Sequence, residues 1–418
     1  MQHKIDPLKY GPRGQVMADA IQSCVHCGFC LATCPTYRVL GQEMDSPRGR
    51  IYLMKSVLEE RIPAPDAQPY IDRCLGCVAC VPACPSGVPY GKLLLSYRGL
   101  VEVERKRPLL GAVAHKMIVE TLPYPDRFRA AVKTSKIGKL TQRVLPGQFQ
   151  AMLQMLPEKL PPAVPLPDIF PAKGQRRARV ALLTGCVQQA LAPEINWATV
   201  RVLAENGVET VIPKQQTCCG SILMHTGEVE RAQALARQNL RAFPTDVDAI
   251  VTNAAGCGSG MKEYGLLFRG QMEEEMGQHF ASKALDVAEF LAGLDFVPPP
   301  GFARPLSVAY QDACHLRHAQ GVVSEPRHLL STVPNLTVLE LEDGGLCCGS
   351  AGTYNLEQPD IAHQLGQRKV ERILATGAAA VVSGNIGCLT QIQTHLRPRG
   401  VSLPVYHTLE LLDMAYRL

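Results

Sequence analysis

Two runs of four cysteines have the spacing that binds iron–sulfur clusters. The runs are Cys24, Cys27, Cys30, Cys34 and Cys74, Cys77, Cys80, Cys84, and a proline follows each fourth cysteine. The first three cysteines of a run lie along one short loop and can bind three irons of a 4Fe–4S cube, while the fourth reaches the other cube. We therefore predict one cluster on Cys24, Cys27, Cys30 and Cys84, and a second on Cys74, Cys77, Cys80 and Cys34. A protein that carries two such clusters transfers electrons.

Other uses of these cysteines fit the spacing less well. Disulfides within Cys-x2-Cys pairs would be strained, and structural zinc usually takes two such pairs separated by a longer loop. We interpret His26, inside the first run, as a neighbour that tunes hydrogen bonds to the sulfurs and not as a ligand.

Length and charge narrow the class of protein. The chain has 418 residues, 16 cysteines and a net charge of +5. It is long enough for two or three domains with full cores, and its charge is too small to indicate nucleic acid as a partner. Its start lacks the apolar core of a signal peptide, and no run of about 18 apolar residues predicts a membrane span. We expect a cytoplasmic protein with reduced cysteines.

Helices are expected to connect the two cysteine loops. Cys34 and Cys74 are separated by 39 residues, which is more than a compact two-cluster ferredoxin needs. Ser46-Pro47-Arg48-Gly49-Arg50 is typical of a helix start, and apolar residues follow it at helical spacing. We interpret residues 1–100 as a helical ferredoxin domain with two 4Fe–4S clusters.

Residues 101–177 are predicted to form a basic helical segment and a proline-rich linker. The segment begins with Arg105-Lys106-Arg107, and the linker contains six prolines between Pro157 and Pro171. The basic residues have two interpretations. They are a solvated helix face packed on the next domain, or a docking surface for anionic lipid headgroups or an acidic partner.

The remainder of the chain is an internal duplication, which we divide into residues 178–300 and 301–418. The first copy contains Cys186, Cys218, Cys219 and Cys257, and the second contains Cys314, Cys347, Cys348 and Cys388. Corresponding cysteines lie 128 to 131 residues apart. Each copy alternates short β-branched strands with helical stretches, which predicts an α/β unit with a parallel sheet. The fold class is therefore α+β multidomain, a ferredoxin domain followed by two Cys-Cys-Gly repeats.

The cysteines of each repeat are expected to converge. They follow predicted strands, and the carboxyl ends of parallel strands share one edge, where ligands bind. Gly220 and Gly349 would let the backbone turn away sharply behind each cysteine pair. Each set could hold an additional open or distorted cluster with one bridging sulfur, or form a structural or redox-active thiol site. We interpret His225, His315 and His318 near these loops as hydrogen-bonded residues and not as ligands.

Further motifs resemble a known family. They are Cys24-Val-His-Cys-Gly-Phe-Cys-Leu-Ala-Thr-Cys-Pro-Thr-Tyr37, Ser46-Pro-Arg-Gly-Arg-Ile-Tyr-Leu53, Leu346-Cys-Cys-Gly-Ser-Ala-Gly-Thr-Tyr354, Ala255-Gly-Cys-Gly258 and Asn385-Ile-Gly-Cys388. The chain resembles the heterodisulfide-reductase-related Cys-Cys-Gly iron–sulfur proteins, and within them the iron–sulfur subunits of glycolate oxidase (glycolate dehydrogenase). It departs from heterodisulfide reductase because neither repeat ends in Cys-x2-Cys.

The resemblance implies a subunit of an oxidoreductase complex. Partner subunits would bind FAD and oxidise glycolate to glyoxylate, and this chain would carry the electrons to a quinone or another acceptor at the inner face of the cytoplasmic membrane. We identify no catalytic residue in the chain itself, because it has no dinucleotide fingerprint and no convincing catalytic triad or carboxylate pair. The alternatives are the equivalent subunit of a D-lactate or glycerol-3-phosphate dehydrogenase, or a heterodisulfide-reductase-like thiol/disulfide enzyme.

Overall fold

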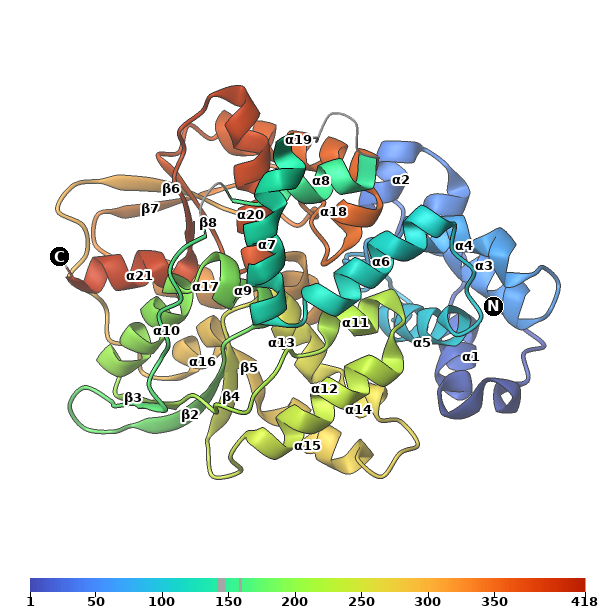
Figure 1. Ribbon diagram of the computed structural model, residues 1–418, viewed down its shortest axis with the longest axis horizontal. Helices are drawn as coiled ribbons and strands as arrows, with labels where there is room; N and C mark the ends of the chain where they lie inside the picture. Colours follow the sequence, from blue (N-terminus) through green and yellow to red (C-terminus); the bar gives the residue numbers. More distant parts are fainter. Residues whose placement is uncertain (141–146, 158–159, 418) are drawn as a thin grey trace.

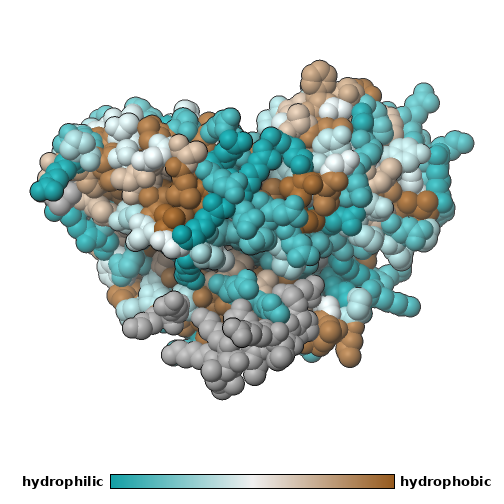
Figure 2. Space-filling view, turned by 90° about the horizontal axis from the view of Figure 1, so that it is seen from above, coloured by the Kyte–Doolittle hydropathy of each residue, from teal (hydrophilic) through white to brown (hydrophobic). Residues whose placement is uncertain are grey.

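The structure is a computed structural model that describes residues 1–140, 147–157 and 160–417. Figure 1 shows the N-terminal helices at one end of the molecule and the two sheets toward the other, with α6, α7 and α8 lying across the front. Seen from above, hydrophobic side chains form small groups separated by hydrophilic ones (Figure 2). Within the described residues, none of the helices combines the length and the apolar composition needed to cross a bilayer.

Helices and cysteine loops alternate in the N-terminal unit. Its helices are α1 Gly14–Gln22, α2 Pro35–Leu40, α3 Pro47–Leu58, α4 Ala64–Asp72 and α5 Tyr90–Glu102. The helix expected to start at Ser46 is α3, and the Ser46 hydroxyl accepts a hydrogen bond from Gly49 N at 2.9 Å. Met17, Met54 and Leu93 pack in the core beside several of the predicted cluster cysteines.

Three helices follow between the N-terminal unit and the repeats. They are α6 Leu109–Thr121, α7 Pro125–Leu140 and α8 Gly147–Met155. On α6, Ala114, Ile118 and Val119 are buried, whereas Leu109 and Leu110 are exposed. Helix α7 packs on α9, and α8 packs on α18 and α20. The basic segment is therefore helical, and one side of it packs on the repeats.

The first repeat contains a five-stranded sheet in the order β1-β3-β2-β4-β5. Its elements are β1 Ile169–Phe170, β2 Ala178–Leu183, α9 Cys186–Leu191, α10 Glu194–Glu205, β3 Val208–Val211, α11 Ser221–Thr226, α12 Val229–Ala242, β4 Ala249–Thr252, α13 Ala255–Lys262, α14 Tyr264–Leu267, α15 Glu274–Lys283, β5 Ala284–Asp286 and α16 Val287–Gly293. Strands β2 to β5 are parallel, as expected. The short β1 comes from the proline-rich linker and pairs antiparallel with β3, where it covers an otherwise open edge.

The second repeat contains a four-stranded, fully parallel sheet in the order β7-β6-β8-β9. Its elements are β6 Leu306–Tyr310, a π-helical turn His315–Ala319, α17 Ser324–Ser331, β7 Leu336–Glu340, α18 Tyr354–Glu357, α19 Pro359–Ala375, β8 Ala380–Ser383, α20 Ile386–Leu396, β9 Val405–His407 and α21 Thr408–Arg417. This order equals that of β3-β2-β4-β5 in the first repeat, so the duplication extends to the sheet topology.

The two repeats share one hydrophobic core. Helix α10 packs on α21, and α16 packs on α17, so equivalent helices of the two copies exchange contacts. Val180 and Val251 of the first sheet and Val308 and Val382 of the second belong to the same buried cluster. An amphipathic helix must cover its apolar side, and here each repeat supplies that cover for the other. The packing also brings the two cysteine-bearing sheet edges together.

Candidate metal centres

The two ferredoxin-type loops have the same unusual backbone. The second residue after the first cysteine has a positive φ in both loops, 59° at His26 and 64° at Gly76. The fourth residue after the first cysteine also has a positive φ, 91° at Gly28 and 49° at Val78. Non-glycine residues rarely adopt this conformation, and it turns successive backbone N–H groups toward one side, as in an anion-binding nest. The repetition indicates that both loops are shaped to surround a negatively charged group.

The structure groups the cysteines across the two runs. Cys24, Cys27, Cys30 and Cys84 line one small cavity, together with Cys80. Burial raises the pKa of the Cys80 thiol, and the neighbouring thiols of Cys77, Cys74 and Cys34 add to that rise. The fourth cysteine of each run thus lies among the first three of the other. The assignment of iron ligands stays a prediction.

A buried arginine supports the second group. Only 1% of Arg50 is exposed, and its guanidinium donates to Thr36 Oγ1 at 2.9 Å and to the Tyr70 carbonyl at 2.7 Å. It also lies 3.9 Å from Cys34 Sγ. Burial raises the pKa of Cys74, but Arg50 and a second arginine outweigh it and hold that pKa below its usual value. The buried Asp45 carboxylate pairs with Arg50 at 3.2 Å and with Arg73 at 2.8 Å, so two arginines and one carboxylate leave a net positive charge on this group. Thiolates bind iron, so this charge suits the predicted cluster.

All eight cysteines of the repeats line one cavity of about 150 Å³. They are Cys186, Cys218, Cys219 and Cys257 from the first repeat and Cys314, Cys347, Cys348 and Cys388 from the second. Each follows a strand at its carboxyl end, and the paired cysteines lie in the loops after β3 and β7. The sequence predicted an edge for each repeat, and the structure makes the two edges face each other.

Each repeat has a central cysteine flanked by two others. Cys219 interacts with the thiols of Cys218 and Cys257, which lower the pKa of Cys219. Cys348 interacts in the same way with Cys347 and Cys388, which lower its pKa. In this position a sulfur can bridge two metal ions or act as a redox-active thiolate. The geometry therefore agrees both with a further cluster and with a redox-active thiol site in each repeat.

The glycines behind the cysteine pairs adopt the expected turn. Gly220 has a φ of 81° and Gly349 a φ of 91°. A Cβ at position 220 would lie 3.2 Å from the Ala232 carbonyl oxygen, and one at position 349 would lie 2.7 Å from the Ala362 carbonyl oxygen. The turns therefore need glycine for both conformation and space.

Two of the three histidines near these loops, His225 and His315, line the eight-cysteine cavity. His315 Nε2 hydrogen bonds to the Gly76 carbonyl at 3.0 Å, and His318 Nε2 to the Gly345 carbonyl at 2.7 Å. The rings of His225 and His315 meet edge to face, with centroids 5.1 Å apart. Burial lowers the pKa of His315 to about 4, and His225 adds to that effect. A neutral His315 thus links the second repeat to the loop around Cys77.

The second repeat packs its cysteines directly against the ferredoxin domain. Cys314 is a close electrostatic neighbour of Cys77. Cys77 and Cys347 belong to one buried cluster. The Tyr354 hydroxyl donates to the Arg73 carbonyl at 3.0 Å across the same contact. Sequence analysis missed this contact, because no local pattern relates residues separated by more than two hundred positions.

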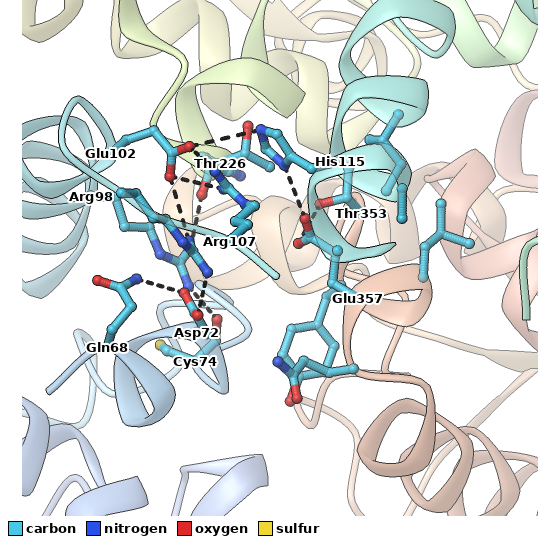
Figure 3. Close-up of a pocket in the computed structure, with 18 of the residues that line it drawn as sticks. Gln68, Asp72, Cys74, Arg98, Glu102, Arg107, His115, Thr226, Thr353 and Glu357 are labelled. Carbon is cyan, nitrogen blue, oxygen red and sulfur yellow. Dashed lines mark hydrogen bonds and ion pairs between the residues drawn. The ribbon is translucent and has the colours of Figure 1, made fainter. Parts of the chain in front are cut away.

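A polar cavity of about 400 Å³ lies beside this contact (Figure 3). His115 lies between two carboxylates, with Nε2 2.9 Å from Glu228 and Nδ1 3.4 Å from Glu357. Burial lowers the pKa of His115, but these carboxylates outweigh it and raise that pKa. Arg107 donates two hydrogen bonds to Glu102, and Arg98 donates to the Cys74 carbonyl at 2.7 Å. The His115 contacts join α6 to both repeats, and Arg98 also donates to the His225 carbonyl at 3.0 Å, which joins the ferredoxin domain to the first repeat.

Two family models match separate parts of the chain. Residues 20–88 match the family model of a 4Fe-4S dicluster domain. Residues 180–262 and 308–393 each match the model of a cysteine-rich domain. The fold resembles the crystal structure of a hypothetical protein from Helicobacter pylori, with a TM-score of 0.52 over 97% of this chain and 72% of that one. The two sequences are 9% identical, so this likeness concerns the fold alone.

Curated relatives match over most of the chain. A Bacillus subtilis protein described as a probable glycolate oxidase iron–sulfur subunit is 38% identical over 91% of this chain and 90% of its own length. The glycolate oxidase iron–sulfur subunit of Escherichia coli is 36% identical over 95% of both chains. The chain therefore belongs to the family of glycolate oxidase iron–sulfur subunits.

Proposed function

We propose that this chain is the electron-transfer subunit of a flavoenzyme complex that oxidises glycolate to glyoxylate. The observation that carries the proposal is the continuous series of cysteine sites. It begins with the group that contains Cys24, continues through the group that contains Cys77, and reaches the eight-cysteine cavity by way of Cys314. The names of the two bacterial relatives support glycolate as the substrate of the complex.

We assign iron to the two ferredoxin-type groups. Cys24, Cys27, Cys30 and Cys84 would hold one 4Fe–4S cluster, and Cys74, Cys77, Cys80 and Cys34 the other. Bound clusters of this type supply one-electron transfer. The protein's own contribution is to bury five of these eight thiols, to place Arg50 beside Cys34 and to hold the second group against Cys314. Each four-cysteine set of the repeats is a candidate for a further cluster or a redox-active thiol site.

Glycolate oxidation itself is assigned to FAD on partner subunits. The glycine-rich stretch Gly256–Gly260 lies inside α13 and is not a phosphate-binding loop between a strand and a helix. The described residues thus offer cysteine sites for electron transfer, while hydride removal from glycolate needs the partner-bound flavin.

We further propose that the acceptor is a quinone and that α6 contacts the cytoplasmic membrane. Leu109, Leu110, Val113 and Met117 form an exposed apolar stripe on this helix, defined here as the α6 stripe. Lys106 and Lys116 are exposed near it. The charges of Arg105 and Arg107 are already paired within the protein, because Arg105 pairs with Asp72 at 2.5 Å and Arg107 pairs with Glu102. The contact would therefore combine apolar insertion with two lysines.

The test is anaerobic purification of this chain with its partner subunits. We expect flavin in the partners, at least about eight iron atoms per chain, and reduction of a water-soluble dye that depends on glycolate. An iron count near twelve or sixteen would indicate clusters in the repeats. Turnover of D-lactate or glycerol 3-phosphate but not glycolate would overturn the choice of substrate. A colourless preparation without iron would overturn the electron-transfer role.

A further inference from the structure

A second, strongly apolar cavity lies directly beside the eight-cysteine cavity. Its volume is about 270 Å³, and side chains of α6, α7 and α8 form most of its wall. Ile118, Phe128, Val132, Met152 and Leu156 are among them. These helices lie together across the front of the molecule in Figure 1. The pocket is therefore built by the segment that connects the ferredoxin domain to the repeats.

The two cavities share part of their walls. Val187 and Ile222 of the first repeat and Ser350, Gly352 and Gly387 of the second line both. Each of these residues lies within four positions of a repeat cysteine. A molecule in the apolar pocket is thus separated from the thiols by a single layer of residues. Both repeats reach it, so either could deliver electrons there.

The pocket wall also contains a few polar groups. Ser350 brings a hydroxyl to the wall shared with the cysteines, and Asn355 brings an amide whose nitrogen donates to Gln391 Oε1 at 3.1 Å. A hydroxyl can donate to a carbonyl oxygen, and the free side of an amide oxygen can accept from a hydroxyl. An apolar pocket with a few polar groups suits a ligand with a flat apolar ring and two oxygen atoms.

The rim of the pocket continues onto the α6 stripe. Met117 lines the pocket and is 46% exposed, while Leu109 and Leu110 farther along the helix are 80% and 57% exposed. A ligand with a hydrocarbon tail could therefore leave its ring in the pocket and its tail along an apolar surface. A water-soluble acceptor would gain nothing from such a surface.

We propose that this pocket binds the ring of a lipophilic quinone. The inference rests on the proposed electron-transfer function and adds to it the location of the acceptor. Reduction of the quinone to its quinol takes up two electrons, which arrive through the cysteine sites, and two protons, which come from water. The residues that bind the ring lie on α6, α7 and α8 and close to the cysteines of both repeats.

A photoreactive short-chain azidoquinone tests the site in the purified complex. We expect illumination to label peptides from residues 109–135 or 149–156, and unlabelled quinone to prevent the labelling. Labelling mainly outside the pocket would overturn the proposal, and so would equal protection by a saturated fatty acid. Because labelling needs no turnover, it tests the pocket even if glycolate is the wrong substrate.

Variants provide a second readout. Met117→Glu places a charge at the rim, and Ser135→Trp fills the pocket from α7. Each should raise the KM for a short-chain quinone by about tenfold or more, because a charge at the mouth of an apolar pocket or lost volume weakens ring binding. Reduction of a water-soluble dye should stay unchanged. The matched control is Met272→Glu, at a residue that is 96% exposed and lies in the first repeat.

Unchanged labelling and an unchanged KM for quinone in both pocket variants would overturn the inference. Failure of the proposed function looks different. In that case the wild-type complex would not reduce the dye with glycolate, whatever the result of the labelling.

Discussion

The two Cys-Cys-Gly repeats have the same strand order and the same placement of cysteines, but their surroundings differ. In the second repeat, Cys347 packs with Cys77 of the ferredoxin domain. In the first repeat, Cys218 and Cys219 pack with Leu223 and Tyr264 in a core that includes Leu95 of the ferredoxin domain but none of that domain's cysteines. The duplication thus produced two equivalent thiol sites, but only the site of the second repeat packs against a cysteine of the ferredoxin domain. Under the proposed function, the second repeat would receive electrons first, because its cysteines pack against Cys77.

The repeats also differ at the residue before their last helix. Asp286 Oδ1 accepts a hydrogen bond from Ala288 N at 2.8 Å at the start of α16. His407 Nδ1 accepts one from Leu409 N at 3.1 Å at the start of α21. Both residues are buried, and burial acts on their charges in opposite directions. It raises the pKa of Asp286 to about 7 and lowers that of His407 to about 4.

The largest effect is expected where the ferredoxin domain meets the second repeat. Cys77→Ala should nearly abolish reduction of the acceptor, because electrons would reach neither repeat. Flavin reduction by glycolate in the partner subunit should continue at its normal rate. Stopped-flow absorbance can follow the two events separately. Full acceptor turnover in this variant would contradict the proposed series of sites.

The inequality of the repeats can be tested at their central cysteines. Cys348→Ala should slow quinone reduction by about tenfold or more relative to Cys219→Ala, because in the proposed series the group that contains Cys77 passes electrons to the second repeat through Cys314. The first-repeat variant should keep part of its turnover. Equal losses of quinone reduction in the two variants would show that the surroundings of the repeats do not decide which repeat receives electrons first.

Alanine substitutions at the two glycine turns should destabilise the protein by different amounts. Gly349→Ala and Gly220→Ala each force alanine into a left-handed conformation, at a cost of about 1 to 3 kcal/mol. The loss should be larger at position 349, because the new Cβ would lie 2.7 Å from a carbonyl oxygen, compared with 3.2 Å at position 220. Thermal unfolding of the two variants measures the difference. A larger loss in Gly220→Ala would contradict this geometry.

The smallest net effect is expected in the pH dependence of the stability of the wild type, because two contributions oppose each other. Between about pH 4 and pH 7, folded Asp286 keeps a proton that the unfolded chain has lost, so its contribution to stability falls as pH rises. Folded His407 lacks a proton that the unfolded chain binds below about pH 6.5, so its contribution rises with pH, by about 3 kcal/mol at most. The two slopes oppose each other in the wild type.

Substituting Asp286 or His407 should reveal the pH dependence of stability that the other residue contributes. Relative to the wild type, Asp286→Asn should make stability rise more steeply with pH over this window, and His407→Asn should make it fall. Asparagine retains a side-chain acceptor at both helix starts, which makes the variants matched. Denaturant unfolding at several pH values gives the comparison. Parallel pH curves for all three proteins would refute the assigned ionisation states.

Much of the candidate site could be predicted from local spacing. Cysteines three residues apart must share a loop, and the position of Gly220 and Gly349 beside paired cysteines is enough to indicate sharp turns. The roles of Arg50, His115 and Tyr354 could not be predicted in this way. Arg50 appeared only as part of a helix start, because nothing in its sequence neighbourhood reports that its charge is buried beside Cys34.

The sequence by itself determined the chemistry: which side chains could bind iron, the duplication, and the alternation of strands and helices that brings four cysteines to one sheet edge. Those properties depend on residue type and on short separations along the chain. Only the tertiary structure decided that the two edges face one cavity, that Cys314 meets Cys77, and that an apolar pocket adjoins both repeats. These depend on helix packing between distant segments, which is set by the fit of whole surfaces and leaves no periodic pattern in the sequence.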